Sequence, residues 1–183
     1  MKEVLFISGN RNKAREVNEM LGAWGISVKQ KPLEIEEIQD KDVEKVAGKK
    51  AEAAFSALRV PVLVEDTGLH IEAMNGYPGS LIRHFIDSIE IEGILGFLKG
   101  KKRSASAVTA FAYCDHDGVH TFRGEKPGRI ADEIKTRTDF DWDCIFIPEG
   151  HEVTYSQLSS DVKNSISQRR LALERFADWF QKQ

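Results

Sequence analysis

The sequence predicts an α/β protein with a mixed β-sheet. Short apolar runs such as Val4–Ile7 and Val62–Val64 have the length of buried strands, whereas the segment 42–58 places its apolar residues on one helical face. The two kinds of segment alternate along the chain, which is typical of α/β folds. A hairpin signal at 115–118 indicates that part of the sheet is antiparallel.

Length and charge narrow the class of protein. The chain has 183 residues, 41% of them hydrophobic, which suits a single domain over residues 1–183 with a real core. Its net charge of −3 argues against a nucleic-acid partner, because the chain as a whole lacks a basic surface. The apolar run Val4–Ile7 is too short for a signal peptide or a membrane helix. With Cys114 and Cys144 as the only cysteines, we expect a soluble cytoplasmic protein without a membrane partner.

The first half of the chain reads as strands separated by helices. Val4–Ile7 runs into Ser-Gly-Asn, and a helix follows that closes at Gly22. A second strand is expected over 27–30, with the acidic segment 31–41 as a loop. The helix over 42–58 then leads to the strand Val62–Val64, which we expect to end at the polar residues of 65–68.

The second half begins with turn residues over 75–79, followed by helical segments over 80–88 and 91–98. Strands are expected over 104–114 and 119–123, on either side of the hairpin turn. Gly124, Pro127 and Gly128 are expected to break the next stretch. A short strand over 145–147 and a final helix from about Ser165 to Phe180 complete the chain.

A possible anion site opens the first helix. The segment consists of Ser8, Gly9, Asn10, Arg11, Asn12 and Lys13. Backbone N–H groups at a helix N-terminus, with a glycine and a nearby lysine, favour a group such as phosphate. On spacing alone, an ordinary strand-to-helix turn capped by Asn10 is the simpler explanation of the same residues.

Two acidic segments offer a candidate metal site. Glu65 and Asp66 follow a buried strand and should point to its opposite faces, so that one of them lies where α/β folds place ligands. A second carboxylate could come from Glu34, Glu36 or Glu37, and two such groups suit Mg²⁺. A helix cap or a surface ion pair is the alternative.

A lysine interrupts the apolar stripe of the helix over 42–58. At 100° per residue Lys50 falls between Val46 and Ala54, whereas Lys49 falls at the edge of the stripe. An inward lysine either meets an anion or extends its amine to the surface.

Two further segments combine groups suited to a base or a phosphate. Phe140, Asp141, Trp142 and Asp143 join aromatic rings to carboxylates, although core packing would explain them too. The segment 163–170 carries Lys163 and Arg169 around Ser165 and Gln168, whose spacing is that of a capping box.

Together these segments resemble the inosine triphosphate pyrophosphatase family, also called Ham1-like. The resemblance rests on five motifs in order, SGNRNK, VEDTGL, NGYPGSLIRHF, FDWDCIFIPEG and KNSISQR. The chain departs from the family pattern twice, since Asp141 replaces a glycine and Gln168 replaces a histidine.

The resemblance implies an elongated mixed sheet with flanking helices, two lobes around a nucleotide cleft, and a homodimer. The implied reaction is Mg²⁺-dependent hydrolysis of ITP, dITP and XTP to the monophosphate and pyrophosphate. By the same resemblance Glu37 and Asp66 bind the metal, and Asp66 also accepts the proton of the attacking water. The implied phosphate-binding residues are Ser8, Gly9, Asn10, Arg11, Asn12, Lys13 and Lys163, with Lys50 and Arg83 nearby. The remaining implied nucleotide contacts are Thr67, Phe140, Asp141, Trp142, Asp143, Gln168 and Arg169.

Two other functions remain open on the sequence. One is that of the related Maf-like pyrophosphatases, which act on pyrimidine or modified nucleotides. The other is a nucleotide-binding sensor that has lost catalysis.

Overall fold

The computed structural model describes residues 2–138 and 142–183. Within them a seven-stranded sheet has the order β2-β1-β3-β5-β6-β7, and β4 pairs with β3 outside this path. The strands are β1 (Lys2–Ile7), β2 (Ile26–Lys31), β3 (Val62–Ile71), β4 (Pro78–Gly79), β5 (Ser104–Asp115), β6 (Gly118–Ile130) and β7 (Phe146–Pro148). The helices are α1 (Arg11–Gly22), α2 (Val43–Leu58), α3 (Ile82–Phe97), α4 (Ser160–Ile166) and α5 (Gln168–Phe180), with short 3₁₀ turns η1 (Glu72–Met74) and η2 (Tyr155–Gln157).

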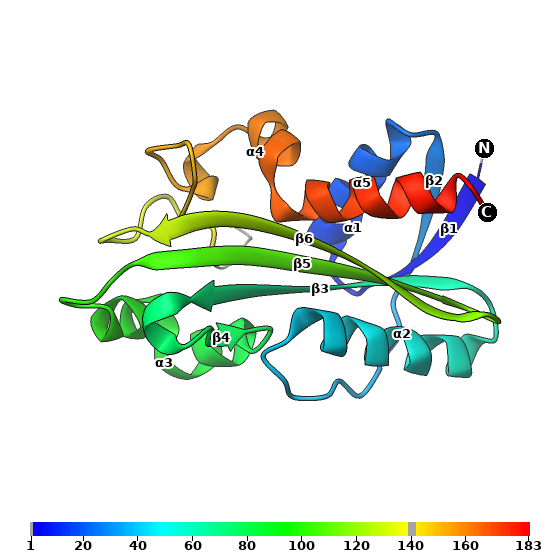
Figure 1. The fold of residues 1–183 in the computed structure, drawn as a ribbon, viewed down its shortest axis with the longest axis horizontal. Coiled ribbons are helices and arrows are strands. Elements are labelled where there is room, and N and C mark those ends of the chain that lie inside the picture. The colour runs from blue at the N-terminus through cyan, green and yellow to red at the C-terminus, as the bar shows by residue number, and fades with distance from the viewer. Residues whose placement is uncertain (1, 139–141) are drawn as a thin grey trace.

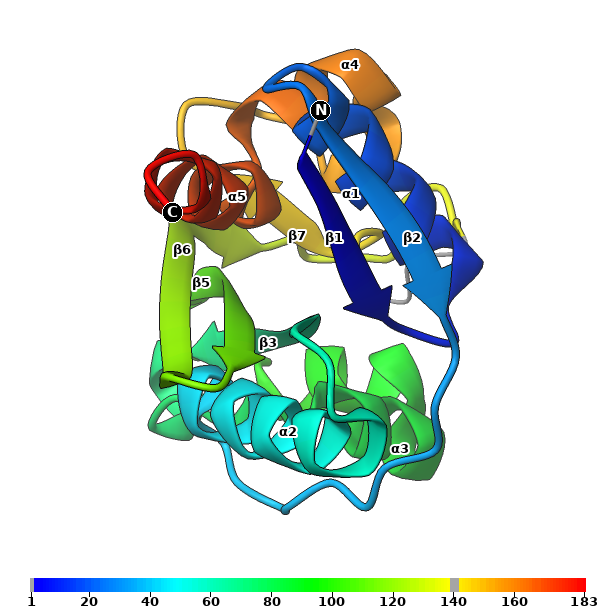
Figure 2. The same ribbon diagram turned by 90° about the vertical axis from the view of Figure 1, so that its right-hand side faces the viewer.

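The sheet is mixed, as predicted. β1 runs parallel to β2 and β3, whereas β3, β5, β6 and β7 are successively antiparallel. Figure 1 shows β3, β5 and β6 side by side along the length of the molecule, with α5 on one face and α2 and α3 on the other. Figure 2, viewed from the end, shows β1 and β2 beside α1, away from α2.

The core consists of three clusters of buried side chains that follow this arrangement. One joins α1 and α5 to β1 and β5 through residues such as Val17 and Phe176, both fully buried. A second lies under α2, around Ala47 and Val64, and a third lies around α3, β7 and Tyr155. Burial of these apolar faces holds helices on both sides of the long strands.

β3 does not end where the apolar run ends. The prediction that it stops before Glu65 is wrong, because the strand continues to Ile71 and stays paired with β5 throughout. Glu65 and Asp66 are therefore mid-strand residues opposite Phe111 and Ala110. Backbone pairing with β5 continues the strand although its side chains become polar at Glu65. These polar side chains lie against other charged groups and a cavity.

The predicted break after the hairpin is also wrong. β6 passes through Gly124, Pro127 and Gly128 to Ile130. A Cβ atom at Gly124 would lie 2.1 Å from the carbonyl oxygen of Gln168 and 2.5 Å from the amide nitrogen of Ala172. This glycine therefore admits the backbone of α5 against the strand.

The C-terminal helix is divided in two, which corrects the prediction of one helix from Ser165. Ser167 ends α4 and caps α5, where its side chain accepts from the N–H of Arg170 at 3.2 Å. Ser165 does not form the expected capping box, since its hydroxyl donates to the carbonyl of Val162. The break brings Lys163 and Gln168 to one place from two helices.

The other predicted elements agree with the structure. α3 is kinked at Glu90, whose φ of 59° separates the two helical segments that were expected. Among the described helices, none combines the length and the apolar character that crossing a membrane would require.

We predict that Gly124→Ala will lower the free energy of unfolding by about 1–3 kcal/mol, the usual effect of overpacking. The added methyl group would meet α5 backbone, which cannot move aside as a flexible side chain can. Urea denaturation measures the change. Gly22→Ala is the control, because nothing lies within 4 Å of the added atom. Equal stability of Gly124→Ala and wild type would contradict the packing argument.

Candidate functional site

A cavity of about 640 Å³ lies where α1, β3, α2, α3 and α5 approach one another. Its volume is within the roughly 300–1,000 Å³ of small-molecule sites. The apolar part of its wall includes Ile7, Leu33, Ile35, Ile82 and Ile86. The rest is polar and charged, which suits a ligand with both an apolar and an anionic part.

The N-terminus of α1 forms one edge of the cavity. Asn10 caps the helix, its side-chain oxygen accepting from the N–H groups of Asn12 and Lys13 at 2.9 and 3.1 Å. The turn capped by Asn10, which was the alternative to an anion site, is therefore present. The same segment also borders the cavity through Ser8, Gly9, Asn10 and Lys13. Arg11 is exposed, and neither it nor Asn12 belongs to the cavity wall.

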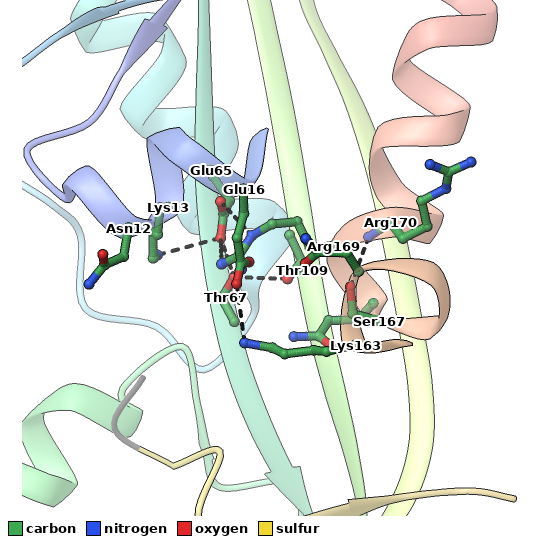
Figure 3. A network of polar contacts seen from close by, with 12 residues as sticks. Asn12, Lys13, Glu16, Glu65, Thr67, Thr109, Lys163, Ser167, Arg169 and Arg170 are labelled. Atoms are coloured by element: carbon green, nitrogen blue, oxygen red, sulfur yellow. Dashed lines mark hydrogen bonds and ion pairs between the residues drawn. The ribbon is translucent and has the colours of Figure 1, made fainter. Parts of the chain in front are cut away.

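Beside the cavity lies a buried group of ion pairs centred on Arg169 (Figure 3). The Arg169 guanidinium donates to both carboxylate oxygens of Glu65, at 2.8 and 3.1 Å, and a further N–H donates to Glu16. The Arg169 side chain is 4% exposed and that of Glu65 1%. A bidentate pair of this kind joins α5 to β3, and Glu16 adds α1.

Two lysines complete this group. Lys163 lies 3.3 Å from Glu16 and 2.5 Å from Asp143, and Lys13 lies 3.5 Å from Glu65. We call the six residues the buried ion network: the cations Lys13, Lys163 and Arg169 and the anions Glu16, Glu65 and Asp143. Three cations face three carboxylates, so no charge in it is left uncompensated, as burial requires.

The pKa values within the network reflect this balance. Burial alone would raise the pKa of Glu65, but the charges of Arg169 and Lys13 overcome it and hold that pKa well below the usual range. At Asp143 burial dominates, and its pKa is raised although Lys163 lies beside it. The network therefore contains one firmly ionised carboxylate and one that is easier to protonate.

Sequence reasoning found no role for Glu16 and gave Glu65 a minor one. A signal existed for Glu16, since at 100° per residue it lies only 40° from the buried Met20 on α1. The burial of Glu65 could not be predicted in this way, because it depends on β3 continuing past the apolar run.

Asp66 lies on the other face of β3 from Glu65, as the alternation of strand side chains predicts. Burial raises the pKa of Asp66 to about 6, while a hydrogen bond from Ser80 and the charges of Lys13 and Lys50 act against the rise. Its Oδ2 atom is buried and has no hydrogen-bond partner among the described residues. Both carboxylates belong to the cavity wall, but Asp66, in contrast to Glu65, has no strong ion pair.

Glu37 lies close enough to Asp66 for its charge to raise the Asp66 pKa, and it pairs with Lys50. Within the described part of the chain, no three acidic, histidine or cysteine side chains gather as a complete metal site. Two carboxylates, one with an unpartnered buried oxygen, fit a hard divalent cation that takes its other ligands from water and phosphate oxygens.

The two adjacent lysines of α2 are placed as the helical wheel predicts. Lys50 lines the cavity, with a side chain 19% exposed. Lys49 is 57% exposed and pairs with Glu52 on the outer surface. The inward lysine therefore has its amine at the cavity.

The remaining predicted residues divide into three groups. Thr67 borders the cavity and donates to Glu65 at 2.5 Å. Arg83, Trp142, Asp143, Lys163, Gln168 and Arg169 also lie in the cavity wall. Phe140 and Asp141 lie outside the described residues, so the structure gives no account of them.

Comparisons with known proteins show the family of the chain. The model of the Ham1 family matches residues 4–179. A dITP/XTP pyrophosphatase of Methanopyrus kandleri is 42% identical over 180 residues, covering 97% of this chain and 96% of the relative. An inosine triphosphate pyrophosphatase of Candida glabrata is 39% identical, covering 95% of each chain. The structure of a HAM1 protein from Coxiella burnetii superimposes with a TM-score of 0.87 and 28% identity, covering 100% of both chains. The chain therefore belongs to the Ham1 family.

Proposed function

We propose that this protein hydrolyses non-canonical purine nucleoside triphosphates, namely ITP, dITP and XTP, to the monophosphate and pyrophosphate. The observation that carries the proposal is Asp66, a buried carboxylate with an unpartnered oxygen on the wall of a cavity that also presents Lys13 and Lys50. The names of the relatives support the choice of substrate.

Asp66 is suited to accept the proton of an attacking water. Before a metal binds, its pKa of about 6 leaves it mostly ionised at neutral pH yet more basic than an exposed aspartate. Glu65 cannot take this role, because Arg169 and Lys13 stabilise its ionised form and lower its basicity. Glu65 and Asp66 are adjacent in sequence, but they lie on opposite faces of β3 and therefore have different functions.

We propose Mg²⁺ as the metal, held by Asp66 and Glu37. Once bound, it supplies neutralisation and polarisation of the phosphoryl oxygens. Lys13 and Lys50 lie on the same cavity and can bind the remaining phosphate charge, with Ser8, Gly9 and Asn10 along the edge. Arg83, at the start of α3, is a further cation in the wall.

Part of the cavity wall is suited to the base. Trp142, Asp143 and Gln168 belong to this wall and offer a ring face and several polar groups. Lys163, which pairs with Asp143, keeps its assignment to a phosphate. Arg169 neutralises Glu16 and Glu65 beside these residues, in addition to the direct nucleotide contact implied for it.

The wider setting belongs to the same proposal. We infer one functional unit over residues 1–183 that acts as a homodimer in the cytoplasm, without nucleic acid or membrane. The free, buried thiols of Cys114 and Cys144 support a reducing compartment.

The central experiment is pyrophosphate release with Mg²⁺ from ITP, XTP, dITP, GTP, ATP and the pyrimidine triphosphates. We expect preference for ITP and XTP. Preference for pyrimidine nucleotides would support the Maf-like alternative, and binding without turnover would support a sensor.

We predict that Asp66→Asn will lower kcat by roughly 10²–10⁴-fold, the usual effect of losing a general base. Asn is isosteric, so circular dichroism and thermal unfolding should show a folded protein. Asp117→Asn at the exposed hairpin turn is the control and should retain activity. Turnover of Asp66→Asn within threefold of wild type would contradict the assignment.

We predict that Lys50→Met will raise the KM for ITP by roughly 10–100-fold, the effect of losing a charged hydrogen bond. Methionine preserves the apolar stem of the side chain in α2. Lys49→Met is the matched control on the outer surface and should leave KM unchanged. A larger effect at Lys49 than at Lys50 would show that the phosphates do not lie on the inward side of α2.

A further inference from the structure

Gln168 lies in the part of the cavity wall that is assigned to the base. It is the first residue of α5, it is 3% exposed, and it belongs to the cavity wall. A glutamine amide has an acceptor at one end and two donors at the other, so its orientation decides which ligand atoms it can meet.

Tyr155 of η2 holds one end of this amide. Its hydroxyl donates to Oε1 of Gln168 at 3.0 Å. The Tyr155 ring is 1% exposed and packs against Phe146 and Trp142, with centroid distances of 5.1 and 6.5 Å. The hydroxyl therefore has a fixed direction.

The direction of this hydrogen bond follows from its two atoms. The phenol O–H is the donor and Oε1 of Gln168 is the acceptor, because an amide oxygen carries no hydrogen and can only accept. The donor end of the amide, Nε2, is then turned away from Tyr155.

Within the described residues no acceptor bonds to Nε2, and this atom is not among the buried polar atoms that lack a partner. Because Gln168 lines the cavity, the cavity is the place that remains for these donors. A ligand atom that meets them must be an acceptor.

We propose that Tyr155 is a positioning residue that locks the Gln168 amide with its donors toward the base, so that the site selects purines carrying an acceptor at position 6. This inference rests on the proposed function. The 6-oxo group of hypoxanthine or xanthine accepts from Nε2, whereas the 6-amino group of adenine would place a donor against a donor. A glutamine free to turn by 180° would accept from adenine as readily as it donates to hypoxanthine, so the discrimination depends on the tyrosine hydroxyl.

The test is the ratio of kcat/KM for ITP to that for ATP in Tyr155→Phe. Phenylalanine keeps the ring packing and removes only the hydroxyl, and we expect the ratio to fall about tenfold, mainly through improved use of ATP. A general loss of structure would lower both substrates together and leave the ratio unchanged. Tyr113→Phe is the matched control. Tyr113 packs against Phe176 and Trp179, in the cluster that joins α1 and α5 to β1 and β5, and its variant should keep the wild-type ratio.

A second variant pair tests whether Tyr155 acts through Gln168. In Gln168→Ala the amide is absent, so adding Tyr155→Phe should leave the ITP to ATP ratio as it is in Gln168→Ala. A further fall in the double variant would overturn the proposal, as would an unchanged ratio in folded Tyr155→Phe.

A measurement without substrate separates this inference from the proposed function. The side-chain carbonyl ¹³C signal of Gln168 should shift in Tyr155→Phe and not in Tyr113→Phe. If wild type releases pyrophosphate from no purine triphosphate, the proposed function fails, and base selection by the locked amide fails with it. The ¹³C signal still decides the lock itself, because an unchanged signal would show that no hydrogen bond holds the amide.

Discussion

The site depends on one buried guanidinium. Arg169 draws Glu16 from α1 and Glu65 from β3 to the first turn of α5, and all three side chains are less than 10% exposed. Removing any one of them would leave an uncompensated charge in the protein interior, which costs far more than a surface ion pair contributes. Three of the elements that border the cavity, α1, β3 and α5, are thus tied by the same interaction.

The neutrality of the buried ion network also explains why Asp66 differs from its neighbour. Lys13 is directed at Glu65, Lys163 at Asp143 and Lys50 at Glu37. Asp66 is left with weaker partners and a buried oxygen without a hydrogen bond among the described residues. The site therefore leaves Asp66 free of a strong ion pair, as its proposed roles require, whereas Glu65, Asp143 and Glu37 pair with cations.

Much of this arrangement could be predicted from the sequence. Apolar runs and helical periodicity located most elements, and the period of 3.6 residues distinguished Lys50 from Lys49 correctly. These features are local, since each depends on residues within a few turns of one another.

The errors have a common cause, which is tertiary contact that no local pattern contains. β3 continues past Val64 because β5 pairs with it, and Gly124 marks the close approach of α5 and not a strand end. Glu16 and Arg169 are 153 residues apart, and their meeting could not be inferred from spacing. The pairing of Tyr155 with Gln168 likewise depends on the break between α4 and α5 at Ser167.

The claim that the Arg169 interaction organises the site is tested most directly by a double-mutant cycle on the free energy of unfolding. The cycle compares wild type, Glu65→Gln, Arg169→Met and the double variant by urea denaturation. We expect each single variant to lose about 3–5 kcal/mol, and the double variant to lose clearly less than the sum, because it no longer leaves a buried charge unpaired between these two residues. Losses that add to within about 0.5 kcal/mol would contradict the account, since residues without coupling behave in that way.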